Sequence, residues 1–156
     1  MLLTAAVMIA VLVSFVFFYN QLAKLEELTL QTWADVTEQF DRQHALLQKL
    51  NEQAPIILPT ELEKLLQKAT DASNANERLQ TEKQLGNMLE QFLSQSDENN
   101  KERLRQEADK IETDLQKARL KYNASVRYYN VALHTVPTCW IAKATKAEEK
   151  IFYKID

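Results

Sequence analysis

Residues 122–130 read Tyr-Asn-Ala-Ser-Val-Arg-Tyr-Tyr-Asn and contain two Tyr-Asn pairs. The pairs, Tyr122-Asn123 and Tyr129-Asn130, lie seven residues apart. Seven residues make two turns of an α-helix, so a helix would present both pairs on one face. The stretch therefore predicts a helical face of aromatic side chains with polar tips.

The apolar pattern extends this helix in both directions. Pro137 ends it, and the polar run at residues 95–101 precedes it. Spacings of three and four residues, typical of helical bundles and coiled coils, predict a helix from about residue 99 to 136. The positions in this pattern are Leu104, Ala108, Ile111, Leu115, Ala118, Tyr122, Val126, Tyr129, Leu133 and Val136.

Composition points to an all-α protein. The 156 residues include one Gly and three Pro, which leaves few sites for turns and favours long helices. A net charge of −3 argues against a nucleic-acid-binding surface. The single cysteine, Cys139, excludes an internal disulfide framework and a metal cluster built on cysteines.

Residues 1–19 carry no charged side chain. As a helix they would span about 28 Å, close to the thickness of about 30 Å of a bilayer's hydrocarbon core. A cleaved signal peptide is the alternative, but the run ends in bulky side chains and no Lys or Arg precedes Lys24. We predict an uncleaved transmembrane anchor, with Tyr19 and Asn20 at the membrane–water interface. The position of Lys24 weakly favours a cytoplasmic location for the rest of the chain.

The anchor is expected to continue into a helix that ends near residue 53, before Pro55 and Pro59. Two shorter helices should follow, one from Thr60 and one over 77–94, with residues 71–76 as a loop or a weak point. The predicted fold is an elongated antiparallel up-down bundle of three to four helices, two of them long. The expected division is an anchor at 1–19, a bundle at 20–136 and an amphipathic tail at 137–156.

Antiparallel pairing of the two long helices would bring residue 136 towards the membrane end of the bundle. The tail then supplies Trp140, Lys143, Lys146 and Lys150, an aromatic and basic set suited to lipid headgroups. Alternatively, the tail packs on the bundle or is frayed.

The chain resembles the LemA family of bacterial membrane-anchored helical proteins. The specific block is Glu112-x-x-Leu115-x-x-Ala118-Arg119-x-x-Tyr122-Asn123-x-x-Val126-x-x-Tyr129-Asn130. Earlier matches are Tyr19-Asn20-x-Leu22, Trp33-x-x-Val36-x-x-Gln39-x-x-Arg42 and His44-x-Leu46-Leu47-x-x-Leu50; the ending matches at Pro137, Ile141-Ala142 and Phe152. The resemblance implies an N-terminal transmembrane helix and an antiparallel helical bundle.

The chain also departs from the family pattern, which suggests a divergent member. The resemblance leads us to expect paired basic residues at Arg42-Gln43 and Pro-Asn at Gln48-Lys49. It also implies a Gly-Phe pair near Thr145-Lys146, where this chain has neither residue.

Catalytic and metal-binding patterns are not evident. His44 and His134 have no ligand partner at helical spacing, and the sequence has no glycine-rich phosphate loop. The carboxylates Glu61, Glu63, Glu77 and Glu82 lie beside lysines and are interpreted as solvated helix faces.

Two interpretations remain for the Tyr-Asn pairs and the arginines near them. The first is a structural network, because buried Tyr hydroxyls and Asn amides must find hydrogen bonds. The second is a polar docking face for a partner's carboxylate or for lipid phosphates. The candidate residues are Tyr19, Asn20, Trp33, Arg42, Arg119, Tyr122, Asn123, Arg127, Tyr129 and Asn130.

The leading functional hypothesis is a non-enzymatic, single-pass scaffold or protein-interaction module at the bacterial inner membrane. It would associate with protein partners or with itself, and we expect no cofactor, nucleic acid or small-molecule substrate. The alternative is a signalling or envelope-complex assembly subunit whose bundle responds to a bound ligand or partner. Binding of a small ligand by the soluble bundle would favour that alternative. An enzyme is the third class.

Overall fold

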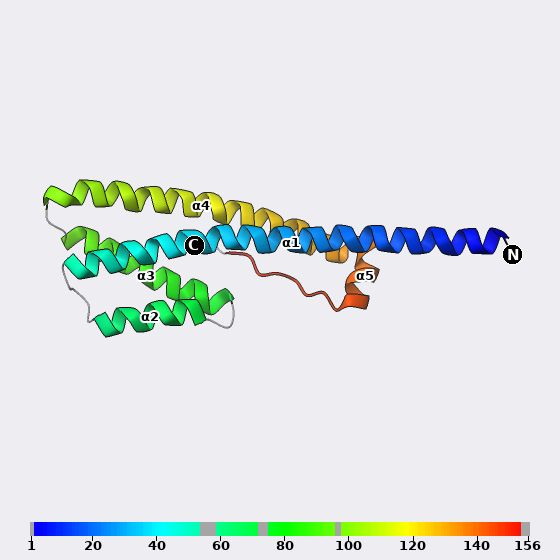
Figure 1. Cartoon of the computed structure of the whole chain (residues 1–156), viewed down its shortest axis with the longest axis horizontal. Helices are drawn as coiled ribbons and strands as arrows, with labels where there is room; N and C mark the ends of the chain where they lie inside the picture. Colours follow the sequence, from blue (N-terminus) through cyan, green and yellow to red (C-terminus); the bar gives the residue numbers. More distant parts are fainter. Residues whose placement is uncertain (1, 54–58, 72–74, 96–97, 154–156) are drawn as a thin grey trace. The chain divides into compact units, whose positions relative to one another are not determined.

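A computed structural model describes residues 2–53, 59–71, 75–95 and 98–153. These residues form helices and no strand, so the predicted all-α class is confirmed. Pro55, which was expected to follow the end of the first helix, and residues 72–74 of the predicted weak point lie outside the described residues. The helices are α1 (Leu2–Gln53), α2 (Pro59–Asp71), α3 (Ala75–Gln95), α4 (Glu98–His134) and α5 (Thr138–Thr145) (Figure 1).

The chain divides into two compact units, and both α1 and α4 contribute residues to each of them. The first unit combines Met1–Ala34 with Leu120–Asp156, and the second is Asp35–Arg119. The residues after α4 thus belong to the same unit as the first part of α1.

The second unit is a bundle of four helical segments around an apolar core. Parts of α1 and α4 pack with α2 and α3, whose leucines recur at helical spacing. The chain's single glycine, Gly86 on α3, faces α1 closely, because a Cβ there would lie 3.2 Å from Gln43 Nε2. The core comprises Leu46, Leu47, Leu50, Leu62, Leu66, Ala69, Leu85, Leu89, Phe92, Leu93, Leu104, Ala108 and Ile111.

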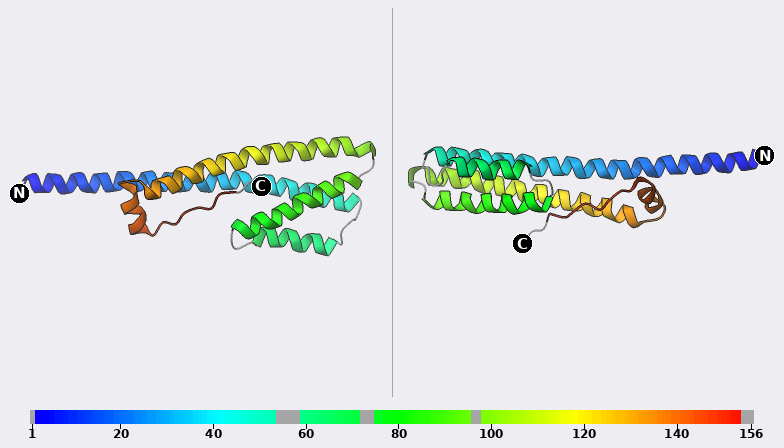
Figure 2. Two further views of the ribbon diagram at one scale, coloured as in Figure 1. Left: turned by 180° about the vertical axis from the view of Figure 1, so that it is seen from behind. Right: turned by 90° about the horizontal axis from the view of Figure 1, so that it is seen from below.

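In the first unit, α1 and α4 run antiparallel. Thr32 contacts Ser125 and Trp33 contacts Tyr122, so rising numbers on one helix meet falling numbers on the other. After Pro137 the chain turns into α5 and then runs back along α4 without regular structure (Figures 1 and 2). The core of this unit is Leu22, Tyr129, Leu133, Ile141 and Ala142.

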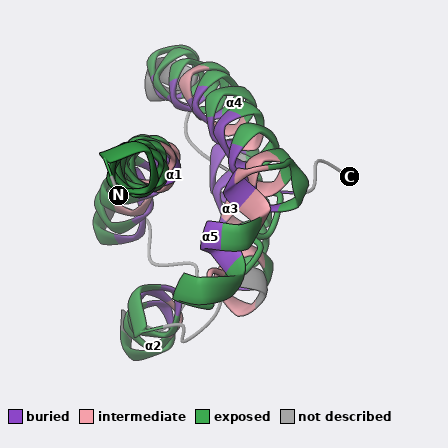
Figure 3. Ribbon diagram, turned by 90° about the vertical axis from the view of Figure 1, so that its right-hand side faces the viewer, coloured by how far each residue is buried: buried purple, intermediate pink, exposed green. Residues whose placement is uncertain are grey.

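The N-terminal end of α1 is apolar and uncovered. Its residues from Leu2 to Phe17 are exposed, and Figure 3 shows this end of the helix exposed on every side. Among the described residues, α1 is the one helix long and apolar enough to cross a membrane. A continuous apolar helix of this length fits a membrane-anchored protein.

Tyr128 and Tyr129 provide a matched pair for testing this packing. They are neighbours on α4, but Tyr128 is 63% exposed and Tyr129 is 1% exposed. We expect Tyr129→Ala to lower the free energy of unfolding by about 3–5 kcal/mol, because it removes a fully buried aromatic ring. We expect Tyr128→Ala to change it by less than about 0.5 kcal/mol. Urea denaturation of both variants measures the difference. Equal losses of unfolding free energy would contradict the finding that α4 turns Tyr129, and not Tyr128, towards α1.

Candidate functional site

Four of the predicted site residues form one surface of α4, which we call the Tyr–Asn face: Tyr122, Asn123, Tyr129 and Asn130. Both tyrosines are buried, and both asparagines are partly buried. The seven-residue repeat accounts for this, because each pair returns to the same side of the helix after two turns. The tyrosines face α1, and the asparagines lie beside them at the edge of the contact.

The tyrosines pack against α1, as their spacing predicts. The Tyr122 and Trp33 ring centroids lie 5.1 Å apart, and Tyr129 packs with Leu22. Burial raises the pKa of the Tyr122 phenol above its ordinary value. Burial and then the charge of the Glu26 carboxylate raise the pKa of Tyr129. Both phenols therefore stay protonated at neutral pH and can donate hydrogen bonds.

Hydroxyl groups also join α1 to α4. Thr32 Oγ1 lies 2.7 Å from Ser125 Oγ, and both residues are buried. Each hydroxyl has one proton, so one of the two donates to the other, and the accepting hydroxyl donates to a carbonyl of its own helix, that of Leu28 for Thr32 or that of Tyr122 for Ser125. Each buried hydroxyl thus has a partner, which explains a threonine in the apolar stripe of α1.

The asparagines hold the backbone of residues 147–153, which we call the C-terminal segment. Asn123 Nδ2 donates to the Tyr153 carbonyl at 2.8 Å, and the Tyr153 N–H donates to Asn123 Oδ1 at 2.8 Å. Asn130 repeats this pattern with Lys150, with both distances at 2.9 Å. Between them, the Tyr122 hydroxyl donates to the Ile151 carbonyl at 2.9 Å.

The two asparagines and their backbone partners are matched in spacing. Seven helical residues separate the asparagines, which corresponds to about 10.5 Å along α4. Three residues separate Lys150 from Tyr153, which corresponds to about 9–10 Å in an extended or polyproline-type chain. Seven residues of helix thus cover nearly the same distance as three residues of extended chain. The segment runs antiparallel to α4, because Asn123 pairs with Tyr153 and Asn130 with Lys150.

The Lys150 side chain completes the contact. Its Nζ lies 3.0 Å from Glu26 Oε1 on α1 and 5.7 Å from the centroid of the Tyr129 ring. An ion pair and a cation–π contact thus fix one side chain of the C-terminal segment. The Tyr153 side chain is also buried, whereas Ile151 and Phe152 are exposed.

Other residues predicted to contact the membrane lie on or after α5. Trp140 is 65% exposed, and Lys143 is exposed in the last turn of the helix. Lys146 ends α5 in a left-handed conformation with φ of 53°, a position that glycine favours. The resemblance places a glycine near this point, and the conformation supplies a physical reason for it. Lys150 differs from these residues because it is paired with Glu26.

The remaining candidates are not brought onto the Tyr–Asn face. Tyr19 and Asn20 are exposed on α1, and Arg127 is exposed on α4. Arg42 and Arg119 belong to the second unit. Arg42 pairs with Glu38 at 2.6 Å, and Arg119 lies 3.8 Å from Glu112.

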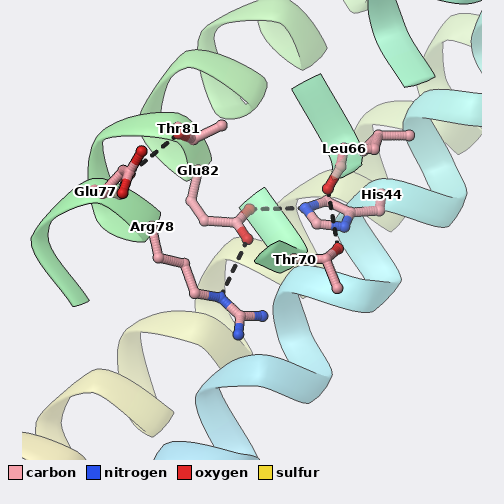
Figure 4. Close-up of polar contacts among 7 residues, drawn as sticks. All are labelled: His44, Leu66, Thr70, Glu77, Arg78, Thr81 and Glu82. Carbon is pink, nitrogen blue, oxygen red and sulfur yellow. Dashed lines mark hydrogen bonds and ion pairs between the residues drawn. The ribbon is translucent and has the colours of Figure 1, made fainter. Parts of the chain in front are cut away.

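The second unit contains a buried charge cluster that the sequence did not reveal. Glu82 was interpreted as solvated, but its side chain is only 1% exposed. His44 Nε2 lies 2.8 Å from one carboxylate oxygen of Glu82, and Arg78 Nε lies 3.8 Å from the other (Figure 4). The available signal was spacing, because Glu82 lies three residues from both Leu79 and Leu85 on the apolar side of α3.

This cluster is suited to neutralising a buried carboxylate. The Arg78 guanidinium also lies 5.8 Å from the centre of the Phe40 ring, so it contacts an apolar surface as well as a charge. Among the described residues, no group of three or more His, Cys, Asp and Glu side chains is placed to hold a metal ion.

The raised Tyr122 pKa predicts a loss of stability in alkali. In the unfolded chain the phenol ionises near pH 10, whereas the folded chain retains its proton to higher pH. The contribution of this group is therefore present below about pH 10 and is lost as the pH rises through the folded-state pKa. Ionisation also removes the proton donated to Ile151.

We expect the unfolding free energy of the wild type to fall more steeply above about pH 10 than that of Tyr122→Phe. Urea denaturation at several pH values measures the slopes. Tyr128→Phe is the control, because that tyrosine is exposed and its loss should leave the slope unchanged. A Tyr122→Phe slope equal to the wild-type slope would contradict the assignment.

The sequence matches a known protein family over most of its length. The LemA family matches residues 32–156, a range that includes the Tyr–Asn face and the C-terminal segment. No curated protein sequence matches the chain significantly. The fold agrees with the earlier resemblance, which implied an apolar N-terminal helix followed by packed helices. The chain belongs to the LemA family.

Proposed function

We propose that this protein is a non-enzymatic interaction module anchored in the bacterial inner membrane by a single pass of α1. The observation that carries the proposal is the uncovered apolar end of α1, Leu2 to Phe17, which continues without a break into the packed helices. A lipid bilayer would cover these apolar side chains, which the rest of the chain leaves exposed, and removing them from water is favourable.

The chemistry of the Tyr–Asn face supports interaction rather than catalysis. Its amides and protonated phenols hold peptide groups by hydrogen bonds. A phenol whose pKa is raised is a poor general base at neutral pH, and an asparagine amide does not titrate. These groups are suited to recognition of a polypeptide.

Deletion of residues 2–17 tests the anchor. Phe18 is retained in this variant because it packs against the core of the first unit. We expect the wild type to sediment with membranes and the deletion variant to stay in the supernatant after centrifugation, because the apolar span is lost. Sedimentation of the deletion variant with membranes would contradict a sole N-terminal anchor.

Trp140→Ala is the matched control, since it removes an exposed aromatic residue near the end of the chain. We expect this variant to remain in the membrane fraction. Its partial release would indicate that the region around α5 also contacts lipid.

Cys139 allows the orientation to be measured. It is the single cysteine of the chain, and it is a half-buried free thiol in the first unit. If the packed helices are cytoplasmic, a membrane-impermeant maleimide should label Cys139 in lysed spheroplasts and not in intact ones. Cys139→Ser is the control for background labelling. Labelling of intact spheroplasts would place the helices on the outer side of the membrane.

A further inference from the structure

We propose that the Tyr–Asn face is a binding site for an extended peptide, and that residues 147–153 of the same chain occupy it. The partner that fits is a protein segment with a lysine followed three residues later by an aromatic residue. This inference deepens the proposed function, because it names the class of partner that the anchored module would take.

The first argument is that the face contacts the main chain. Asn123 and Asn130 each make one donor and one acceptor bond to a backbone peptide group, and Tyr122 donates to a backbone carbonyl. These atoms are present in every peptide. When an extended peptide adds to a sheet edge, main-chain bonds likewise supply affinity and side-chain pockets supply specificity. Here two amides on a helix take the place of the sheet edge.

The second argument concerns which side chains are read. Lys150 is held by Glu26 and the Tyr129 ring, and Tyr153 is buried. By contrast, the side chains of Ile151 and Phe152 are exposed to solvent, at 46% and 39%. The site therefore selects a cation at one position and an aromatic residue at the third position after it, with little demand on the two residues between them.

The third argument is that the C-terminal segment adds only a few side chains to a core that the helices build. Leu22, Tyr129, Leu133, Ile141 and Ala142 form that core; from the segment, Ala147 packs against it and Lys150 contacts the Tyr129 ring. Residues 147–153 have no regular structure of their own, so side-chain contacts hold them in place. A segment held in this way opens at a lower free-energy cost than the surrounding helices.

A peptide of residues 147–156 carrying a fluorophore tests the proposal on the full chain in detergent. The wild type should bind it weakly, because the tethered segment competes at a high effective concentration. Lys150→Glu weakens the tethered segment by placing a carboxylate beside Glu26. We therefore expect Lys150→Glu to bind the added peptide at least about tenfold more tightly than the wild type in fluorescence anisotropy titrations.

Two controls separate recognition from a general loosening of the chain. Adding Asn123→Ala and Asn130→Ala to the Lys150→Glu protein should weaken peptide binding by at least about tenfold, since four hydrogen bonds are removed. Alanine preserves the helix, and circular dichroism verifies this. The second control leaves the protein unchanged and uses a peptide N-methylated at the residues matching Lys150 and Tyr153. It lacks both N–H donors and should bind at least about tenfold more weakly.

Equal binding of the plain and N-methylated peptides would overturn the proposal, as would peptide binding by Lys150→Glu no tighter than by the wild type. A concentration-dependent dimer that is lost on Asn123→Ala and Asn130→Ala would show that the face binds a second copy of the chain. That result would overturn the proposal that it binds a segment of a different protein. Membrane sedimentation of each variant is measured in parallel. Failure of peptide binding with sedimentation intact would refute this inference alone and leave the membrane anchor standing.

Discussion

A polypeptide segment that runs along a helix has no strand with which to pair, so its peptide groups must find other hydrogen-bond partners. In the first unit, the side chains of the Tyr–Asn face provide them. Asn123 and Asn130 each supply a donor and an acceptor, and Tyr122 supplies a further donor. The organisation of the residues after α5 depends on this arrangement, because it holds them in place without secondary structure.

Buried polar side chains occur in both units. In the first unit, the Thr32 and Ser125 hydroxyls pair across α1 and α4, and the one that accepts this hydrogen bond donates its own proton to a carbonyl of its helix. In the second unit, the buried carboxylate of Glu82 is flanked by a histidine and an arginine. Removing one partner from such a cluster leaves an uncompensated charge, which costs far more than a surface ion pair contributes.

Much of the fold could be predicted from the sequence, because apolar spacing and the scarcity of glycine and proline determine where helices form. The inward direction of Tyr129 and the contact between Trp33 and Tyr122 follow from the same spacing. The partner of the asparagines could not be predicted, since a backbone peptide group is the same for every residue type and leaves no pattern in the sequence. Glu82 was misjudged because its lysine neighbour suggested solvent, whereas its distance from the leucines on α3 indicated the core.

The unbroken course of α1 has a consequence for distance. Each helical residue advances about 1.5 Å, so the helix acts as a ruler measured from the end of the proposed span at residue 19. Leu22, which packs with Tyr129, then lies about 5 Å beyond that end, and Trp33, which contacts Tyr122, lies about 20 Å beyond it. If the proposed span lies in a bilayer, a peptide in the proposed site would lie within about 20 Å of the end of the hydrocarbon core, measured along the helix axis. At that distance, the proposed site would be within reach of segments of proteins that are themselves anchored in the same membrane.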